Sequence, residues 1–357
     1  MVGINATLDD ILKLTPVGSV SRAIGNSFFG INHQATPNLV PADKISQGLV
    51  LFTRPQLNLK EENLRCEDGR IFIPILTKNE ASIQRIIRCT LDPRLNKNEM
   101  SCPFVDPLQA FIPILTNQCL SMTPWPDEVS ETYTSEPGRM KEVFSFIDSS
   151  YKNYGVTDQT ATFRNTDGSP IMLMLRIWRA YASYVFEGKM LPYPDYMYRN
   201  WIDYQSRVYR LVLDKHRRTV KHIACTGASF PIASPYGSIF NYDTNSPFNS
   251  ETKEIQVPFR SIGMWYDDPI IINQFNRVVA LFNENMKDQY RDDTMTEVPM
   301  SSLSFFNHKG YPRIDPDSFE LKWYVHRQVY TEQMTAVRET IDTVSARQAI
   351  IEAFQGN

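Results

Sequence analysis

The sequence is poor in glycine and cysteine, and each shortage excludes a common kind of ligand site. Its 357 residues include 15 glycines and 5 cysteines, against 23 prolines. The phosphate-binding patterns GxxxxGK(S/T) and GxGxxG do not occur, and neither do the catalytic patterns HExxH and GxSxG. The cysteines form no CxxC pair, which argues against a zinc site and favours free thiols in a reducing compartment.

The sequence also lacks a charge excess and a long apolar run. Lys and Arg number 37 against 40 Asp and Glu, so the formal charge is −3 and indicates no DNA-coating protein. The most apolar stretch, 171–186, contains Arg176 and Arg179 and is too short to span a bilayer. Asp9 and Asp10 stand where a secretory signal would be positive. We therefore expect a soluble protein, made and kept inside a cell, without membrane contact.

What the sequence does contain favours strands joined by turns and rigid loops. Hydrophobic residues make up 42% and aromatic residues 12%, which is ordinary for a globular chain with a sizeable core. The patterns predict strands at 48–55, 119–122, 127–134, 141–146, 159–164, 207–213, 219–225 and 255–262. They predict helices at 80–89 and 170–186, a helix capped by Asp267 or Asp268, and a long helix from Ser318. The predicted fold class is mainly β with helices (α+β).

Three segments follow from this pattern. We expect an N-terminal arm at 1–47, a β domain at 48–275 with an insertion at 56–110 that carries a short helix, and a C-terminal helical extension at 276–357. The hexapeptide FIPILT occurs at both 72–77 and 111–116. Because its flanks do not match, coincidence is a better interpretation than a duplicated unit.

Two segments of opposite charge are separated along the chain. Residues 123–148 carry six acidic and two basic side chains, and residues 207–222 carry six basic and one acidic. The basic segment is either a solvated hairpin tip or a phosphate-binding surface. A third interpretation is head-to-tail self-association, in which the acidic segment of one chain faces the basic segment of the next.

An enzymatic interpretation has little support. The five histidines are scattered, and we expect no catalytic residue, cofactor or metal site. The best alternative is a Mg²⁺-dependent nuclease that uses Asp127, Glu251 and Lys253, since carboxylates beside a lysine can hold the ion. However, roughly 120 residues separate Asp127 from the other two, whereas a nuclease hairpin would bring them together on adjacent strands.

The tail of the chain has apolar residues at a nearly heptad spacing. They are Tyr330, Met334, Val337, Ile341, Val344 and Ile351, with Gln348 as a polar interruption. This spacing predicts one contact stripe along a helix. The stripe packs either on its own domain or on a neighbouring chain.

The order of elements resembles a known family. The strand and proline turn Asn117-Gln118-Cys119-Leu120-Ser121-Met122-Thr123-Pro124-Trp125-Pro126 is followed by an acidic hairpin, and Asp158-Gln159-Thr160-Ala161-Thr162-Phe163-Arg164 then leads into a helix with Trp178. The hairpin 208–226, Gly227, Pro231 and a closing strand follow. This order is similar to the tail tube proteins of contractile-tailed bacteriophages, which include the type VI secretion tube and baseplate tube-initiator proteins. The resemblance covers about 50–60 and 111–275.

The resemblance implies a structural virion protein rather than an enzyme. Such subunits form stacked six-fold rings, in which long hairpins join an inter-subunit barrel around a channel that passes DNA. It implies that Asp127, Glu128, Glu131 and Glu136 are channel-lining candidates, because a DNA channel should repel phosphate. Lys215, Arg217, Arg218 and Lys221 would then face an adjacent subunit or ring.

The same resemblance implies partners and a location. The partners would be further copies of the chain, neighbouring tail tube, sheath or baseplate proteins, and transiently the phage DNA. The chain would be assembled in the host cytoplasm and reside in the virion tail. The arm, the insertion and the C-terminal extension depart from a simple tube subunit. They leave open a tail-completion or sheath-contacting protein that has no channel.

Overall fold

The structure, a computed structural model, describes residues 48–67, 69–98, 100, 102–149, 153–240 and 254–340. The chain divides into two compact units, Met1–Ser46 and Gln47–Asn357. All described residues belong to the second unit, so the arm predicted at 1–47 lies outside them.

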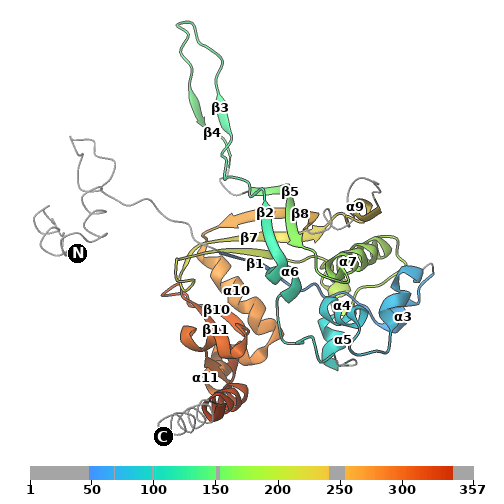
Figure 1. The fold of residues 1–357 in the computed structure, drawn as a ribbon. Coiled ribbons are helices and arrows are strands. Elements are labelled where there is room, and N and C mark those ends of the chain that lie inside the picture. The colour runs from blue at the N-terminus through green and yellow to red at the C-terminus, as the bar shows by residue number, and fades with distance from the viewer. Residues whose placement is uncertain are drawn as a thin grey trace, which may run out of the picture. The chain divides into compact units, whose positions relative to one another are not determined.

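Six antiparallel strands form the central sheet (Figure 1). Their order across the sheet is β1-β6-β7-β8-β5-β2. Their bounds are β1 Gly48–Phe52, β2 Cys119–Thr123, β5 Asn153–Arg164, β6 Val208–Leu213, β7 Val220–Pro231 and β8 Glu254–Tyr266. The strands predicted in these six regions are confirmed, and β5, β7 and β8 are several residues longer than predicted. The α+β fold class is confirmed as well.

The strands form where buried and exposed residues alternate. In β8, Ile255, Val257 and Phe259 are buried, whereas Glu254, Gln256 and Arg260, at the alternate positions, are exposed. A period of two places alternate side chains on opposite faces of a sheet. Along β5 and β8 the sheet therefore has one exposed face and one buried face.

β7 and β8 approach each other closely at two glycines. A Cβ on Gly227 would lie 2.6 Å from the carbonyl oxygen of Ile262, so only glycine fits there. Gly263 has φ 66°, a left-handed conformation that glycine adopts without steric cost.

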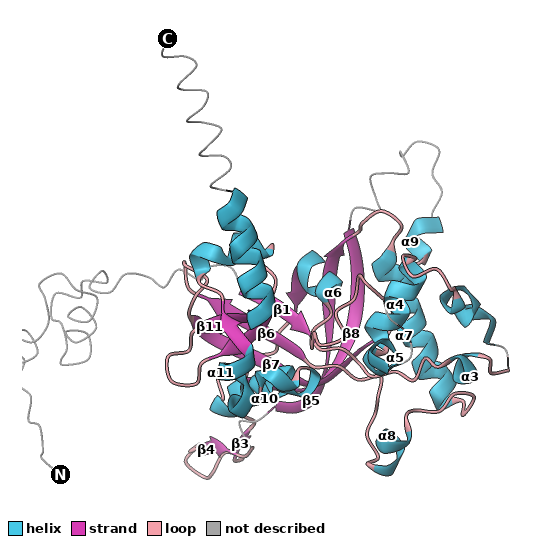
Figure 2. Cartoon of the chain, turned by 90° about the horizontal axis from the view of Figure 1, so that it is seen from below, coloured by secondary structure: helices cyan, strands magenta, loops and turns pink. Residues whose placement is uncertain are grey.

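Helices cover both sides of the sheet and create two hydrophobic cores (Figure 2). The first core lies between the sheet, α7 (Pro170–Phe186) and α4 (Ile83–Leu91). The second lies between the sheet, α10 (Pro269–Phe282) and the strands β10 (Tyr311–Ile314) and β11 (Leu321–His326). Phe52 belongs to the first core and its neighbour Leu51 to the second, as strand alternation requires.

The helix predicted at 170–186 is confirmed in both bounds. Pro170 occupies its first turn, where a missing N–H costs nothing. Seven of its residues are buried, among them Trp178, whose Nε1 donates to the carbonyl oxygen of Tyr204 at 2.7 Å. The Asp268 cap of α10 is also confirmed, because its carboxylate accepts from the N–H of Ile270 at 2.9 Å.

The segment 56–110 is more helical than predicted. It contains α3 (Glu61–Leu64), the 3-10 helix η1 (Gly69–Leu76), α4 and α5 (Pro93–Asn98). The helix predicted at 80–89 corresponds to α4, which begins three residues later because the Ser82 side chain caps it. Short helices α6 (Pro113–Gln118), α8 (Pro194–Tyr198) and α9 (Gly237–Phe240) connect other elements.

The two FIPILT copies adopt different structures. The copy at 72–77 lies mostly in the 3-10 helix η1, with Phe72 in the first core. In the copy at 111–116, Phe111 bridges to Thr53 and lies in the second core, and α6 begins at Pro113. Tertiary contacts therefore decide the conformation of this hexapeptide.

The prediction of a helix from Ser318 was wrong at its start. Leu321–His326 forms β11, in which Leu321 and Val325 are buried, and the helix begins only at residue 327 and is described to 340. A three-stranded sheet of order β10-β11-β9, with β9 at Met295–Glu297, lies in the extension that we expected to be helical. The remaining elements are η2 (Glu284–Met286), α11 (Asp288–Thr294) and η3 (Met300–Phe306), and α10 crosses the predicted boundary at 275.

Candidate assembly interface

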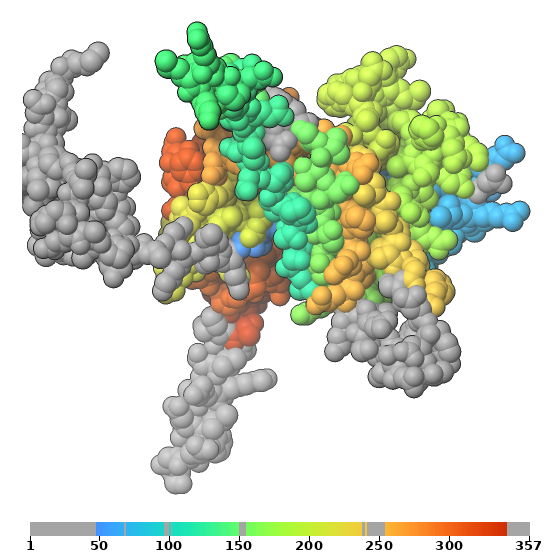
Figure 3. Space-filling view, turned by 90° about the horizontal axis from the view of Figure 1, so that it is seen from above, coloured from blue at the N-terminus to red at the C-terminus, as the bar shows by residue number. Residues whose placement is uncertain are grey.

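A two-stranded hairpin, residues 127–148, projects from the central sheet (Figures 1 and 3). Its strands β3 (Thr132–Thr134) and β4 (Ser145–Ile147) are antiparallel, with Tyr133 opposite Phe146. The N–H of Ser135 donates to the carbonyl oxygen of Phe144 at 2.8 Å, which extends the ladder toward the tip. The strands predicted at 127–134 and 141–146 are present, but they are shorter and begin later than predicted.

The hairpin carries large apolar side chains that nothing in the described chain covers. None of its residues is buried. Tyr133, Phe144 and Phe146 share one face and are 49%, 70% and 57% exposed, and the rings of Tyr133 and Phe146 lie 5.1 Å apart. Met140 at the tip is 90% exposed, and Ile147 on the other face is 67% exposed.

A covering partner would stabilise such a hairpin. An isolated two-stranded hairpin is marginally stable in water, and stability normally needs a third strand or a packed face. Burying the exposed part of one aromatic side chain contributes about 1–2 kcal/mol, so covering the three rings contributes several kcal/mol. An exposed apolar patch of this kind marks a protein–protein contact.

The root of the hairpin is held to the sheet by side chains. Gln159 of β5 donates from Nε2 to the carbonyl oxygen of Pro124 at 3.1 Å. Tyr266, the last residue of β8, donates its hydroxyl to the carbonyl oxygen of Pro126. Trp125 between the two prolines donates from Nε1 to the carbonyl oxygen of Met122 at 3.1 Å.

The four predicted channel-lining residues all lie on the hairpin and are all exposed. Asp127 and Glu128 lie at the root of the hairpin. Burial is the main cause that raises the pKa of the Tyr266 phenol, and the negative charges of Glu128 and Asp127 add to it. Glu131 lies at the start of the ladder, with its carbonyl oxygen bonded to the N–H of Asp148. Glu136 lies near the tip, so the structure spreads the four carboxylates over the whole hairpin.

The four predicted basic residues lie on and beside the turn between β6 and β7. Lys215, Arg217 and Lys221 are exposed, and Arg217 has φ 56°. Arg218 pairs with Glu320 at 3.0 Å, and its carbonyl oxygen accepts from the N–H of Leu321. The turn is therefore attached to the C-terminal sheet, and Arg218 is already partnered within the chain.

The predicted C-terminal stripe is divided between described and undescribed residues. Tyr330 stacks on Phe306 with ring centroids 5.5 Å apart, and Met334 packs on the same small core. Val337 is half-buried. Ile341, Val344 and Ile351 lie outside the described residues. The first turns of this helix thus pack on their own domain, and a contact with a neighbouring chain stays a prediction.

The exposed face of β5 and β8 carries polar pairs. Asp158 and Arg260 lie opposite each other and form a bidentate ion pair at 2.8 and 2.9 Å. The Arg260 hydrogen bonds and charge hold the pKa of the Asp158 carboxyl below its usual range. Thr160 and Thr162 continue this face toward the end of β5.

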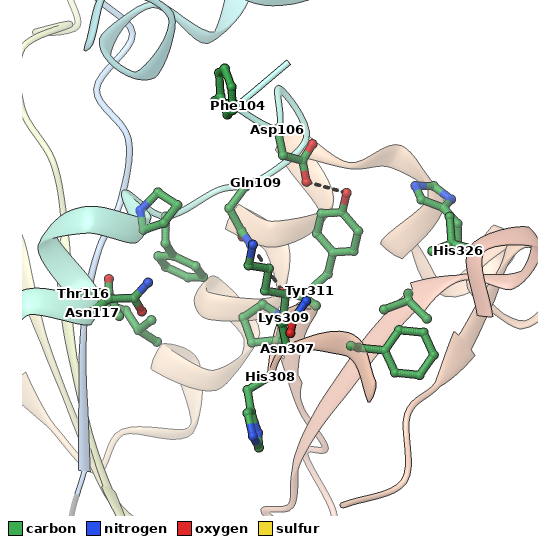
Figure 4. Close-up of a pocket in the computed structure, with 18 residues that line it drawn as sticks. Phe104, Asp106, Gln109, Thr116, Asn117, Asn307, His308, Lys309, Tyr311 and His326 are labelled. Atoms are coloured by element: carbon green, nitrogen blue, oxygen red, sulfur yellow. Dashed lines mark hydrogen bonds between the residues drawn. The ribbon is translucent and has the colours of Figure 1, made fainter. Parts of the chain in front are cut away.

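A cleft of about 720 Å³ lies between the segment 104–117 and the loop 306–312 (Figure 4). The hydroxyl of Tyr311 donates to Oδ2 of Asp106 at 2.7 Å, and Gln109 donates to the carbonyl oxygen of Gly310 at 3.2 Å. Burial, followed by the charge of Asp106, raises the pKa of Tyr311. A general base or nucleophile needs the opposite shift, so this tyrosine is unsuited to that role.

Comparison with known proteins decides the family. The model of the family described as "Putative phage tail tube protein" matches residues 4–341. The chain belongs to this family. The predicted resemblance to phage tail tube proteins is thereby confirmed.

Solved and curated proteins add little to this assignment. The cap of the anti-feeding prophage, described as the AFP tube terminating cap, is similar over 49% of this chain and 98% of its own, at 11% identity and a TM-score of 0.26. A search of the curated proteins finds no match.

Membership in the phage tail tube family makes the chain a structural tail component and not an enzyme. For the nuclease alternative, the structure describes Asp127 as exposed, whereas Glu251 and Lys253 lie outside the described residues. Among the residues described, no three His, Cys, Asp or Glu side chains gather as a metal site would need. No helix in that part of the chain is long and apolar enough to cross a membrane.

Sequence reasoning missed the aromatic face of the hairpin. The charge pattern singles out the acidic residues of this segment but not the aromatic residues of the same strands. The signal was present in the run Val143-Phe144-Ser145-Phe146-Ile147, which is apolar on both faces. A two-stranded hairpin with two apolar faces predicts a partner.

Proposed function

We propose that this tail tube family member forms a ring, hexameric and stacked, around the DNA channel of a phage tail or baseplate. The observation that carries the proposal is the uncovered aromatic hairpin at 127–148. A hairpin that packs on a neighbouring copy would gain both the apolar burial and the additional strand neighbours that it lacks alone. Long hairpins would in this way join an inter-subunit barrel.

Charge gives this association a direction. The hairpin segment carries six acidic against two basic residues, and Lys215 and Arg217 on the β6–β7 turn form no ion pair in the described part of the chain. Contact between the acidic hairpin of one copy and the basic turn of the next is a head-to-tail contact, which generates rings or stacks. Lys215, Arg217, Arg218 and Lys221 accordingly remain our candidates for the contact between subunits or rings.

We propose which residues face the channel from the requirement that a DNA channel repel phosphate. Asp127, Glu128, Glu131 and Glu136 are our lining candidates, since carboxylates do not bind DNA as it passes. The exposed face of β5 and β8 suits the same side, because Arg260 is neutralised by Asp158. The chain would pass DNA without gripping it.

The additional segments are proposed to carry the contacts of this subunit within the tail. In this partition, 1–47 is an arm, 48–275 is the tube-like domain with its insertion at 56–110, and 276–357 is the extension. Neighbouring tail tube, sheath or baseplate proteins are the proposed partners, with assembly in the host cytoplasm and a final location in the virion.

A double variant, Phe144→Ser with Phe146→Ser, tests the proposal. Both side chains are exposed in the single chain, so its thermal unfolding should not change, whereas rings and tails containing it should be lost. Phe240→Ser is the matched control, because Phe240 is 78% exposed and belongs to α9, which lies away from the hairpin (Figure 1). Tails that assemble normally with the double variant would contradict the role of the hairpin.

Symmetric reconstruction of purified tails tests the ring itself. We expect strands of neighbouring copies to pair around an axis. A ring of this chain that lacks a continuous inner barrel would replace the proposal with a tail-completion or sheath-contacting role. Absence of the chain from purified virions would contradict both.

A further inference from the structure

The hairpin leaves the sheet where backbone pairing must stop. The last pair between β2 and β5 is Thr123 with Thr160, so the next pair would be Pro124 with Gln159. Pro124 and Pro126 have no N–H and cannot continue a ladder. Their carbonyl oxygens remain strong acceptors that need partners.

Side chains of β5 and β8 supply those partners. Gln159 is fully buried, and its amide nitrogen donates to the Pro124 carbonyl oxygen at 3.1 Å. Tyr266 reaches the Pro126 carbonyl oxygen two residues further along the root. The two bonds fix two points of the same short segment, and a segment held at two points has a defined direction.

A buried polar network holds Gln159 in its turn. Its Oε1 accepts from the hydroxyl of Ser261 on β8 at 2.8 Å, and the hydroxyls of Ser261 and Ser229 on β7 lie 2.7 Å apart. Ser229 also donates to Oγ1 of Thr226 at 2.8 Å. All four side chains are fully buried. Because a buried polar group is costly unless it is bonded, the network leaves Gln159 one orientation.

We propose that Gln159 and Tyr266 are positioning residues that set the direction in which the assembly hairpin leaves the sheet. The inference rests on the proposed function of the hairpin. Neither residue touches a neighbouring copy in this scheme. Each donates a hydrogen bond to a proline carbonyl oxygen at the root of the hairpin. These bonds thereby determine where Tyr133, Phe144 and Phe146, farther along the hairpin, are placed. Preorganising a binding element in this way removes part of the ordering cost of association.

A distance measurement in the full chain tests the inference directly. Non-natural amino acids that carry spin labels replace Met140, on the hairpin tip, and Phe186, at the end of α7. These two side chains are 90% and 91% exposed, so the labels should not disturb the packing. The labelled chain with Gln159 and Tyr266 intact should give one narrow distribution of the distance between the two labels. Tyr266→Phe, which removes only the hydroxyl at Pro126, should broaden it, and Gln159→Leu should broaden it further.

A matched tyrosine controls for the loss of a hydrogen bond as such. Tyr311→Phe removes a hydroxyl bonded to Asp106, far from the root in sequence, and should leave the distribution narrow. If Gln159→Leu fails to fold, Tyr266→Phe still decides the question. A distribution that stays narrow in Tyr266→Phe overturns the positioning role.

Assembly measured on the same variants separates this inference from the proposed function. Tail assembly should fall about tenfold in Tyr266→Phe, which corresponds to ~1.4 kcal/mol, and should be unchanged in Tyr311→Phe. A broadened distribution with normal assembly keeps the positioning role and contradicts the function proposed for the hairpin. A narrow distribution with reduced assembly contradicts the positioning role alone.

Discussion

Replacing Asp203 by Asn should change the pH dependence of stability. Asp203 is 2% exposed, Oδ2 accepts from the Tyr181 hydroxyl, and Oδ1 has no partner in the described structure. Burial raises the pKa of this carboxyl to about 6, although the Tyr181 hydrogen bond opposes the shift. An unfolded Asp titrates near ~3.9.

The folded state binds the proton of the Asp203 carboxyl more tightly than the unfolded state does. The folded state holds the proton up to about pH 6 and the unfolded state only to about pH 4. The contribution of protonated Asp203 to the free energy of unfolding is therefore complete below ~pH 4 and is lost as the pH rises through about 6. The difference of about 2 between the pKa values corresponds to ~3 kcal/mol lost from the free energy of unfolding at pH 8.

Asp203→Asn removes this titration while its side-chain oxygen can still accept from Tyr181. Any cost of the new amide is the same at all pH values. Urea unfolding of both proteins at several pH values between 4 and 8 should show the variant gaining ~2–3 kcal/mol relative to the original chain as the pH rises. A difference that stays constant over this range would refute the argument, because Asp203 would then not titrate between these limits.

Further substitutions test the packing and one ion pair. Trp178→Ala should lower the free energy of unfolding by about 3–5 kcal/mol in urea titrations, because the indole is fully buried and bonded to a backbone carbonyl oxygen. Gly227→Ala should lower the melting temperature, since its Cβ would lie 2.6 Å from a carbonyl oxygen, while Gly237→Ala, where a Cβ meets nothing within 4 Å, should not. Arg218→Ala should change the free energy of unfolding by less than ~1 kcal/mol in the same titrations, because the Arg218 side chain that pairs with Glu320 is 60% exposed.

The sequence predicted the helices and strands whose ends are marked by a capping residue, a first-turn proline or a polar turn. Pro170 opens α7 and Asp268 caps α10, and both helices begin where those residues require. The β6–β7 hairpin was recognisable from two apolar runs that flank a polar turn. Such signals act within a few residues, so they are legible in a single sequence.

Elements fixed by distant contacts were not predictable. Helical spacing from Tyr330 continues backward through 321–326, which hid β11, and pairing with β9 and β10 decides that segment. Arg54 looked like part of a strand end, yet it is buried and donates to the carbonyl oxygens of Cys89, Thr90, Asp106 and Gln109. Those partners lie 35 to 55 residues away, and no local pattern marks them.

The acidic residues and the aromatic face of the hairpin together determine which surface can cover it. Glu131 and Asp148 flank the aromatic pair at one end, and Glu136 and Glu142 lie toward the tip. Like charges on two identical hairpins disfavour packing the aromatic face of one directly on the aromatic face of the other, while the uncovered rings still require a partner. A basic surface resolves both demands, because it attracts the carboxylates and permits the rings to be buried. The negative charge of the hairpin thus supports the proposed head-to-tail direction of association.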